Sequence, residues 1–199
     1  MPRPNQTREK RQALLPIVAR TFAQRGFRRT TTAELAARCG VRENILYRLW
    51  PDKKAMFIAA IGYVYDQSVA IWSGLLKQDG PGGTPAERLL AYEAHHMGEF
   101  GHYRIVFAGL SETDDPDIRA ALSDMYRRFQ RFVEKQIAAY RRRQGRRARP
   151  APALSAWAIV GLGTVANIAR ELRLVSDEER GRLFASIGRH LLEGRLPER

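Results

Sequence analysis

Residues 31–53 hold the side chains whose types and spacing could do chemistry in this chain. Thr31 and Thr32 stand where a helix is expected to begin, and the free backbone amides of a helix N-terminus bind phosphate. Further hydrogen-bonding or apolar contacts could come from Arg42, Glu43, Asn44, Ile45, Tyr47, Arg48 and Lys53. Arginine and asparagine bind base edges, and basic and hydroxyl side chains bind phosphates. These residues therefore predict contact with double-stranded DNA.

Positive charge is concentrated in the same part of the chain. Residues 1–54 contain 13 Lys and Arg against 4 Asp and Glu, which is +9 of the total of +13. The remainder has 21 against 17, and six of those cations lie in residues 141–149. A phosphate-binding module requires such a concentration, although a basic solvent-exposed face would carry the same charge.

The elements that position these residues are expected to be helices, because no alternating strand pattern is present. Helix starts are marked by N-capping residues. They are Thr31 with Glu34, Thr84 with Glu87, Ser176 with Glu179, Asp52 and Asp115. The pattern predicts an all-α fold of about nine helices, roughly at 8–25, 32–38, 42–49, 53–77, 85–99, 102–110, 116–143, 153–173 and 177–193. Pro16 falls inside the first of them, so that helix should begin near Leu15 or be kinked there.

The short helices at 32–38 and 42–49 are joined by a turn around Gly40, where glycine permits a positive φ. This arrangement is typical of a helix-turn-helix, whose second helix enters the major groove. A short helix pair also occurs in proteins that bind no DNA. The local charge makes DNA binding the favoured interpretation.

The segment TTTAELAARCGVRENILYRLWPDKKAMF, residues 30–57, resembles the DNA-binding domain of the TetR (tetracycline-repressor-like) regulators. The resemblance is specific over about residues 8–60. The matching positions are Phe22, Gly26, Phe27, Thr30, Thr31, Leu35, Ala36, Gly40, Val41, Leu46, Tyr47, Trp50 in place of the usual phenylalanine, Lys53 and Phe57.

The resemblance implies a ligand-responsive transcriptional regulator, a repressor that a small-molecule effector releases from a palindromic operator. The helix at 42–49 would read the groove as part of a homodimer, with Thr31, Tyr47 and Lys53 on phosphates. Residues 1–52 would form the helix-turn-helix domain, and 53–199 the effector-binding and dimerisation domain. The alternative is a sequence-tolerant structural DNA-binding protein without an effector.

Four positions depart from the usual family pattern. Arg42 replaces a small hydroxyl residue, so the N-cap of the reading helix is lost. Asn44 replaces glycine and could bind adenine, and Leu49 replaces an aromatic residue or histidine. Ile45 replaces a hydroxyl residue and could contact a thymine methyl or add to the core. These changes leave the fold prediction unaffected but make the operator sequence unpredictable from the resemblance.

The two helices after Pro152 resemble the dimerisation pair of this family. The interface residues expected are Trp157, Gly161, Val165, Phe184, Ile187 and Leu191. A single thick monomeric core would give the same apolar pattern. The helices corresponding to the family's effector pocket contain Trp72, His96, Phe100, Tyr103, Phe107, Met125, Tyr126, Phe129 and Asn167, although most of these could be plain core residues.

Other features predict little chemistry. No set of nucleophile, base and orienting group is apparent, so we expect no enzyme and no cofactor. His95, His96 and His102 lack the spacing of metal ligands, so we expect no metal. The run from Arg141 to Arg149 is interpreted as a solvated loop, with a secondary nucleic-acid contact as the alternative.

Three observations favour a cytoplasmic protein. The single cysteine, Cys39, is consistent with a reducing compartment, and its place between the two short helices suggests a packing role. Residues 1–12 are polar and basic, unlike a secretory signal. The uncharged segment 150–169 is short and polar for a membrane span, so no membrane partner is expected.

Overall fold

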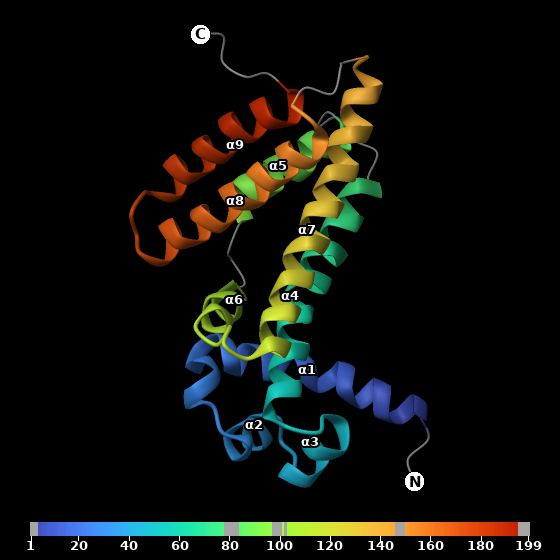
Figure 1. Ribbon diagram of the computed structural model, residues 1–199, viewed down its shortest axis with the longest axis vertical. Helices are drawn as coiled ribbons and strands as arrows, with labels where there is room; N and C mark the ends of the chain where they lie inside the picture. Colours follow the sequence, from blue (N-terminus) through green and yellow to red (C-terminus); the bar gives the residue numbers. More distant parts are fainter. Residues whose placement is uncertain (1–3, 78–83, 97–100, 102, 146–149, 195–199) are drawn as a thin grey trace. The chain divides into compact units, whose positions relative to one another are not determined.

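The computed structural model describes residues 4–77, 84–96, 101, 103–145 and 150–194. Over these residues the chain forms nine α-helices and no strand, which confirms the all-α prediction (Figure 1). The helices are α1 (Pro4–Arg29), α2 (Thr32–Arg38), α3 (Glu43–Leu49), α4 (Lys53–Lys77), α5 (Pro85–His96), α6 (Tyr103–Leu110), α7 (Pro116–Arg143), α8 (Pro152–Glu171) and α9 (Asp177–Glu193).

The first helix differs from the prediction. It begins at Pro4, so a start near Leu15 is wrong, and helical backbone continues through Pro16. The non-helical backbone lies at Gly26, with φ 74° and ψ 173°. Glycine accepts a positive φ because it has no Cβ to clash with the following carbonyl.

The predicted helix starts are formed by side-chain caps. Thr31 Oγ1 accepts a hydrogen bond from the Glu34 amide at 3.1 Å, and Asp52 Oδ1 accepts one from the Ala55 amide at 2.7 Å. Ser176 and Glu179 form both halves of a capping box. Thr84 with Glu87 and Asp115 with the amides of residues 117 and 118 cap α5 and α7. Each cap satisfies amides that have no partner within the helix.

The described chain divides into two compact units. The N-terminal unit comprises Met1–Gln67 and Phe100–Met125, and the C-terminal unit comprises Ser68–Glu99 and Tyr126–Arg199. Helices α4 and α7 each contribute to both. The functional division into 1–52 and 53–199 remains a prediction.

The core of the N-terminal unit lies under α2 and α3. Phe22, Phe27 and Phe57 form an aromatic group, with centroids 5.0 Å apart for Phe22 and Phe57 and 4.9 Å apart for Phe27 and Phe57. Leu35 of α2 and Leu46 of α3 are fully buried in the same unit. This packing stabilises two helices that are too short to be stable alone.

In the C-terminal unit, α9 packs against both α5 and α8, and α8 and α9 lie side by side in Figure 1. The apolar contacts include a cluster of Ala94, Ala166 and Phe184. A Cβ at Gly188 would collide with Leu90, so this glycine allows α9 to approach α5 closely. The sequence pattern contained no signal for that approach.

The prediction of a solvated arginine run is wrong for Arg141. This residue belongs to α7 and is only 2% exposed. Its guanidinium donates to the carbonyls of Leu192 at 3.0 Å, Leu191 at 2.7 Å and Pro150 at 2.5 Å, and to Ser155 Oγ at 2.8 Å. The side chain therefore joins α7 to the start of α8 and the end of α9. Arg142 and Arg143 are exposed, and residues 146–149 lie outside the described part.

Two described helices, α4 and α8, are long and apolar enough to cross a membrane by length and composition alone. The core helix of a soluble protein passes the same test. Only 17% of the apolar window of α8 is buried, so an apolar face of this helix is left uncovered within the described chain.

Candidate nucleic-acid interface

The turn between α2 and α3 fixes the direction of the second helix. Gly40 has φ 64°, and the amide of Val41 donates to the Ala36 carbonyl at 3.0 Å while that of Gly40 donates to the Ala37 carbonyl at 3.1 Å. These two bonds form a Schellman motif, which ends a helix at a left-handed residue. The predicted role of Gly40 in the turn is confirmed.

Helix α3 buries one face and exposes the other. Leu46 and Leu49 point into the core, whereas the exposed residues are Arg42, Glu43, Asn44, Tyr47 and Arg48. Arg42 makes no side-chain cap, as expected from its replacement of a hydroxyl residue. Ile45 is half-buried, so a core contact and a contact to a thymine methyl both remain open. The exposed face thus combines two arginines with an amide, the groups that bind base edges and phosphates.

A hydrogen-bond chain links the start of α2 to α3. Tyr47 Oη donates to Thr32 Oγ1 at 3.2 Å, and Thr32 Oγ1 donates to Glu43 Oε2 at 2.8 Å. The Glu43 carboxylate is therefore held beside the threonine. Thr32 uses its hydroxyl proton internally, so it would have to exchange partners to donate to a phosphate.

Thr31 is exposed, and its hydroxyl oxygen caps α2. An accepting hydroxyl still has its own proton to donate, which leaves it able to bind a phosphate oxygen. The phosphate role predicted for Thr31 stays a prediction that this geometry permits.

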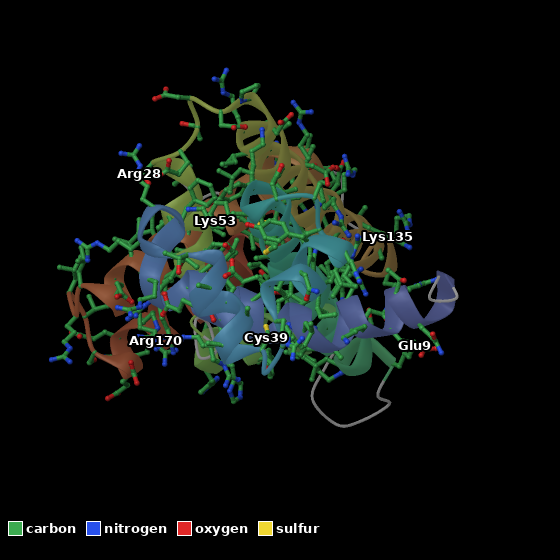
Figure 2. The ribbon with its side chains drawn as sticks, turned by 90° about the horizontal axis from the view of Figure 1, so that it is seen from below. Glu9, Arg28, Cys39, Lys53, Lys135 and Arg170 are labelled. Atoms are coloured by element: carbon green, nitrogen blue, oxygen red, sulfur yellow. The ribbon has the colours of Figure 1, made fainter. Side chains whose placement is uncertain are left out.

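Lys53 is engaged within its own unit. Its ammonium donates to the carbonyls of Phe27 and Thr30, both at 3.1 Å, and lies 4.4 Å from the centroid of the Phe27 ring. Figure 2 labels this side chain in a view from below. Since an ammonium has three N–H bonds, one remains for the phosphate contact that the family resemblance implies.

Several other basic groups are paired within the N-terminal unit. Arg25 binds Glu34 at 3.0 Å, Arg28 binds Glu112 at 2.8 Å, and Lys54 binds Asp117 at 2.6 Å. The hydrogen bond and charge of Arg25 hold the pKa of Glu34 below its ordinary value. Some of the basic side chains that contribute to the charge of +9 over residues 1–54 are therefore paired with carboxylates and are not free to bind phosphates.

The end of α3 is held by a contact that sequence reasoning missed. Arg11 of α1 donates to the Leu49 carbonyl, and its guanidinium lies 5.6 Å from the centroid of the Trp50 ring. The pair is separated by 38 positions, so no local spacing indicates it.

Cys39, labelled in Figure 2, is half-buried, and burial raises the pKa of its thiol. A thiol kept protonated is consistent with the packing role expected for it.

The residues predicted for an effector pocket lie in both units. Tyr103, Phe107 and Met125 belong to the N-terminal unit, where Met125 is core and the two rings are 5.6 Å apart. The C-terminal unit contains Trp72, His96, Tyr126, Phe129 and Asn167. Phe100 and His102 lie outside the described residues.

Two of the C-terminal pocket residues have notable surroundings. Trp72 is buried against Phe129, with ring centroids 5.5 Å apart. Asn167 has a buried Oδ1 that accepts no hydrogen bond from the described residues.

His96 is exposed and its ring stacks on that of Tyr92, with centroids 4.4 Å apart, and His95 Nδ1 lies 2.8 Å from the Ala91 carbonyl oxygen. Among the described residues there is no group of three or more potential metal ligands.

The residues predicted for the dimer interface separate into two sets. Trp157, Gly161, Val165 and Ile187 are exposed on α8 and α9, and Leu191 is half-buried. Phe184 is only 3% exposed because it packs on Ala94 and Ala166 of its own unit. It is therefore a core residue of the C-terminal unit and not part of an exposed face.

Comparison with known proteins agrees with this geometry. Residues 19–60 match the family described as bacterial regulatory proteins, tetR family. The nucleoid occlusion factor SlmA of Escherichia coli is 28% identical over 141 residues, which is 69% of this chain and 71% of that protein. For the first three curated relatives the match covers only 21–28% of their own length.

Solved structures share the fold. A TetR-family regulator from Rhodococcus sp. has a TM-score of 0.74 at 20% identity, over 92% of this chain and 99% of that one. A transcriptional regulator from Saccharomonospora viridis in complex with choline has a TM-score of 0.73 at 18% identity, over 92% and 96%.

The buried core, the Schellman turn and the exposed polar face of α3 define a helix-turn-helix DNA-binding protein. Residues 19–60 thus match the tetR family of bacterial regulatory proteins, and the described chain shares the fold of solved TetR-family regulators.

Proposed function

We propose that this protein is a ligand-responsive repressor of transcription that binds a palindromic operator as a homodimer. The observation that carries the proposal is the exposed face of α3, where Arg42, Asn44 and Arg48 project from a helix anchored by Leu46 and Leu49. A rigid support under the base-contacting side chains is what sequence recognition requires. Residues 1–52 form the DNA-binding domain in this proposal.

Dimerisation is assigned to one surface of the C-terminal unit, the α8–α9 apolar face. It consists of Leu154, Trp157, Val165, Ile168, Leu172, Leu183 and Ile187, all of them exposed. A contiguous apolar surface on a soluble protein marks an interaction site, and a two-fold dimer pairs the same patch on both subunits. Palindromic operators mirror that symmetry.

Effector binding is assigned to the domain of residues 53–199. The unsatisfied Oδ1 of Asn167 supports this assignment, because buried acceptors are normally paired and a ligand could supply the donor. The choline complex of the Saccharomonospora viridis regulator shows that a protein with this fold binds a small molecule. The effector would act by preferring the conformation whose DNA-binding heads do not match the operator. Such a regulator acts in the cytoplasm and is not an enzyme.

The first test is selection of binding sites from random duplex DNA with the purified full chain. We expect an inverted repeat, bound about 10³-fold more tightly than random DNA. In the selected complex Arg48→Ala should weaken binding at least tenfold, since it removes a base or phosphate contact. Arg28→Ala is the matched control, because this exposed arginine is already paired with Glu112, and it should change affinity less than twofold.

A second candidate is a DNA-binding factor that acts without a small-molecule effector. It is favoured by the likeness to SlmA, a nucleoid occlusion factor, over 69% of the chain. Weak binding that enriches no motif and is lost steeply as salt rises would support a sequence-tolerant factor of this kind and contradict the operator proposal.

A further inference from the structure

A carboxylate and three aromatic rings meet in the C-terminal unit. Trp72 of α4 donates its indole N–H to Glu93 Oε1 of α5 at 2.6 Å. The indole centroid lies 5.5 Å from that of Phe129 and 5.1 Å from that of Phe132, both on α7. We call this group the Glu93 cluster. It joins α4, α5 and α7 through Trp72, which contacts both the carboxylate and the two phenylalanine rings. No pattern in the sequence indicates Glu93 or Phe132.

The Glu93 carboxyl is held in an unfavourable environment for a charge. Burial is the largest effect on it and raises its pKa above the ordinary value. The hydrogen bond from Trp72 and the nearby charge of His96 act in the opposite direction but do not cancel that effect. Glu93 is half-buried as a residue, and the neutral indole N–H of Trp72 is poor compensation for a carboxylate that loses contact with water.

The arrangement supplies both halves of cation recognition. Aromatic rings attract a cation through their negative faces when it lies within about 6 Å of the centroid, and the attraction is strongest away from water. The carboxylate adds the opposite charge, which a bound cation would stabilise in the ionised form. If Glu93 served only to accept the hydrogen bond from the Trp72 N–H, a neutral acceptor such as an amide would be sufficient at this position. Titratable groups with such perturbed surroundings are concentrated at functional sites.

We propose that the Glu93 cluster is the cation-recognising part of the effector site, and that the effector is an organic amine or quaternary ammonium compound with apolar substituents. This inference depends on the proposed function, since it names the ligand class of the same regulator. Anions are disfavoured at the site by the charge of Glu93, and neutral molecules of the same shape lack the attraction of the carboxylate.

The test is calorimetric titration of the full-length protein with probes of matched shape. The cations are 2-phenylethylammonium and benzyltrimethylammonium, and the neutral and anionic partners are 2-phenylethanol and phenylacetate. At least one cation should bind tenfold or more tightly than 2-phenylethanol, and phenylacetate should bind most weakly. The same cation should release the protein from the selected inverted repeat.

Variants show whether Glu93 is responsible. Glu93→Gln keeps an oxygen to accept from Trp72 but removes the charge, so it should weaken cation binding at least tenfold and leave binding of 2-phenylethanol unchanged. Glu178→Gln removes an equivalent charge from an exposed site on α9 and should change neither. The melting temperature of Glu93→Gln should not fall below that of the parent protein, since a buried charge is lost, and this verifies folding.

Equal affinity for the cations and the neutral probe, or cation binding that Glu93→Gln leaves intact, would overturn the inference. Cation binding that leaves the operator complex unaffected would overturn the effector role. Either result differs from failure of the proposed function, which would appear earlier as the absence of a selected inverted repeat.

Discussion

Individual residues show how the same chemical type takes opposite roles in this chain. Arg141 and Arg142 are adjacent at the end of α7, yet Arg141 is buried and Arg142 is exposed. Desolvation lowers the pKa of the Arg141 guanidinium, but arginine remains charged in proteins. Its charge is met by carbonyl oxygens, two of which belong to the C-terminal turn of α9, where the helix dipole is negative.

At this scale we predict that Arg141→Met lowers the free energy of unfolding by about 3 kcal/mol, because it leaves buried acceptors unpaired. Arg142→Met is the matched control, and exposed substitutions of this kind stay within about 0.5 kcal/mol. Urea denaturation of both variants measures the difference. Equal stability of the two would show that the four Arg141 hydrogen bonds contribute nothing net.

Among the elements, α8 ends at a strained residue. Arg173 has φ 53°, and the amide of Leu174 donates to the Ala169 carbonyl at 2.9 Å while that of Arg173 donates to the Arg170 carbonyl at 3.2 Å. This is the same Schellman pattern that Gly40 forms after α2, but with a side chain at the left-handed position. The left-handed conformation costs a residue with a Cβ about 1–2 kcal/mol.

Arg173→Gly should therefore stabilise the protein by about 1 kcal/mol, after allowing for the greater entropy of glycine in the unfolded chain. Arg173→Ala is the control, since it removes the charge but keeps the Cβ, and it should bring no such gain. Thermal denaturation compares the two. A gain in both variants would point to the charge of Arg173 and not to its backbone angle.

For the molecule as a whole, the main consequence is assembly. Val165 is 57% exposed and Ile187 41% exposed within a face that has no cover in the described chain. Burying such a face between two subunits contributes about 25 cal/mol for each Å² of apolar surface removed from water, which opposes the loss of translational and rotational freedom on association. The operator proposal depends on this assembly, because a single head would read only one half-site.

We predict that Val165→Glu weakens the dimer at least 100-fold, because it places a charge in the apolar interface. Operator affinity should fall with it. Ala70→Glu puts the same charge on an exposed position of α4 and should leave a dimer. Analytical ultracentrifugation measures the assembly state, and a Val165→Glu protein that remains dimeric would remove the α8–α9 apolar face from the interface.

Much of the fold could be predicted because its signals are local. The N-caps at Thr31, Asp52 and Ser176 and the glycine turn at Gly40 each act over a few residues, so the helix starts and the helix-turn-helix follow from neighbouring positions. The exposed residues of α3 were expected for a related reason. Leu46 and Leu49 form one apolar stripe on a short helix, and the remaining positions must face solvent.

Other features depend on residues far apart in the chain, and no local pattern encodes them. The apolar stripe of α9 did not reveal that Phe184 is covered by Ala94 and Ala166 while Ile187 is left exposed. The basic run did not indicate that Arg141 binds carbonyls 50 and 51 positions away. Nor did the position of Glu93 on α5 indicate that its carboxylate accepts a hydrogen bond from the Trp72 indole. Helical periodicity shows which side of a helix is apolar, but only the packing of the helices decides which apolar and charged groups are covered and which remain available to a partner.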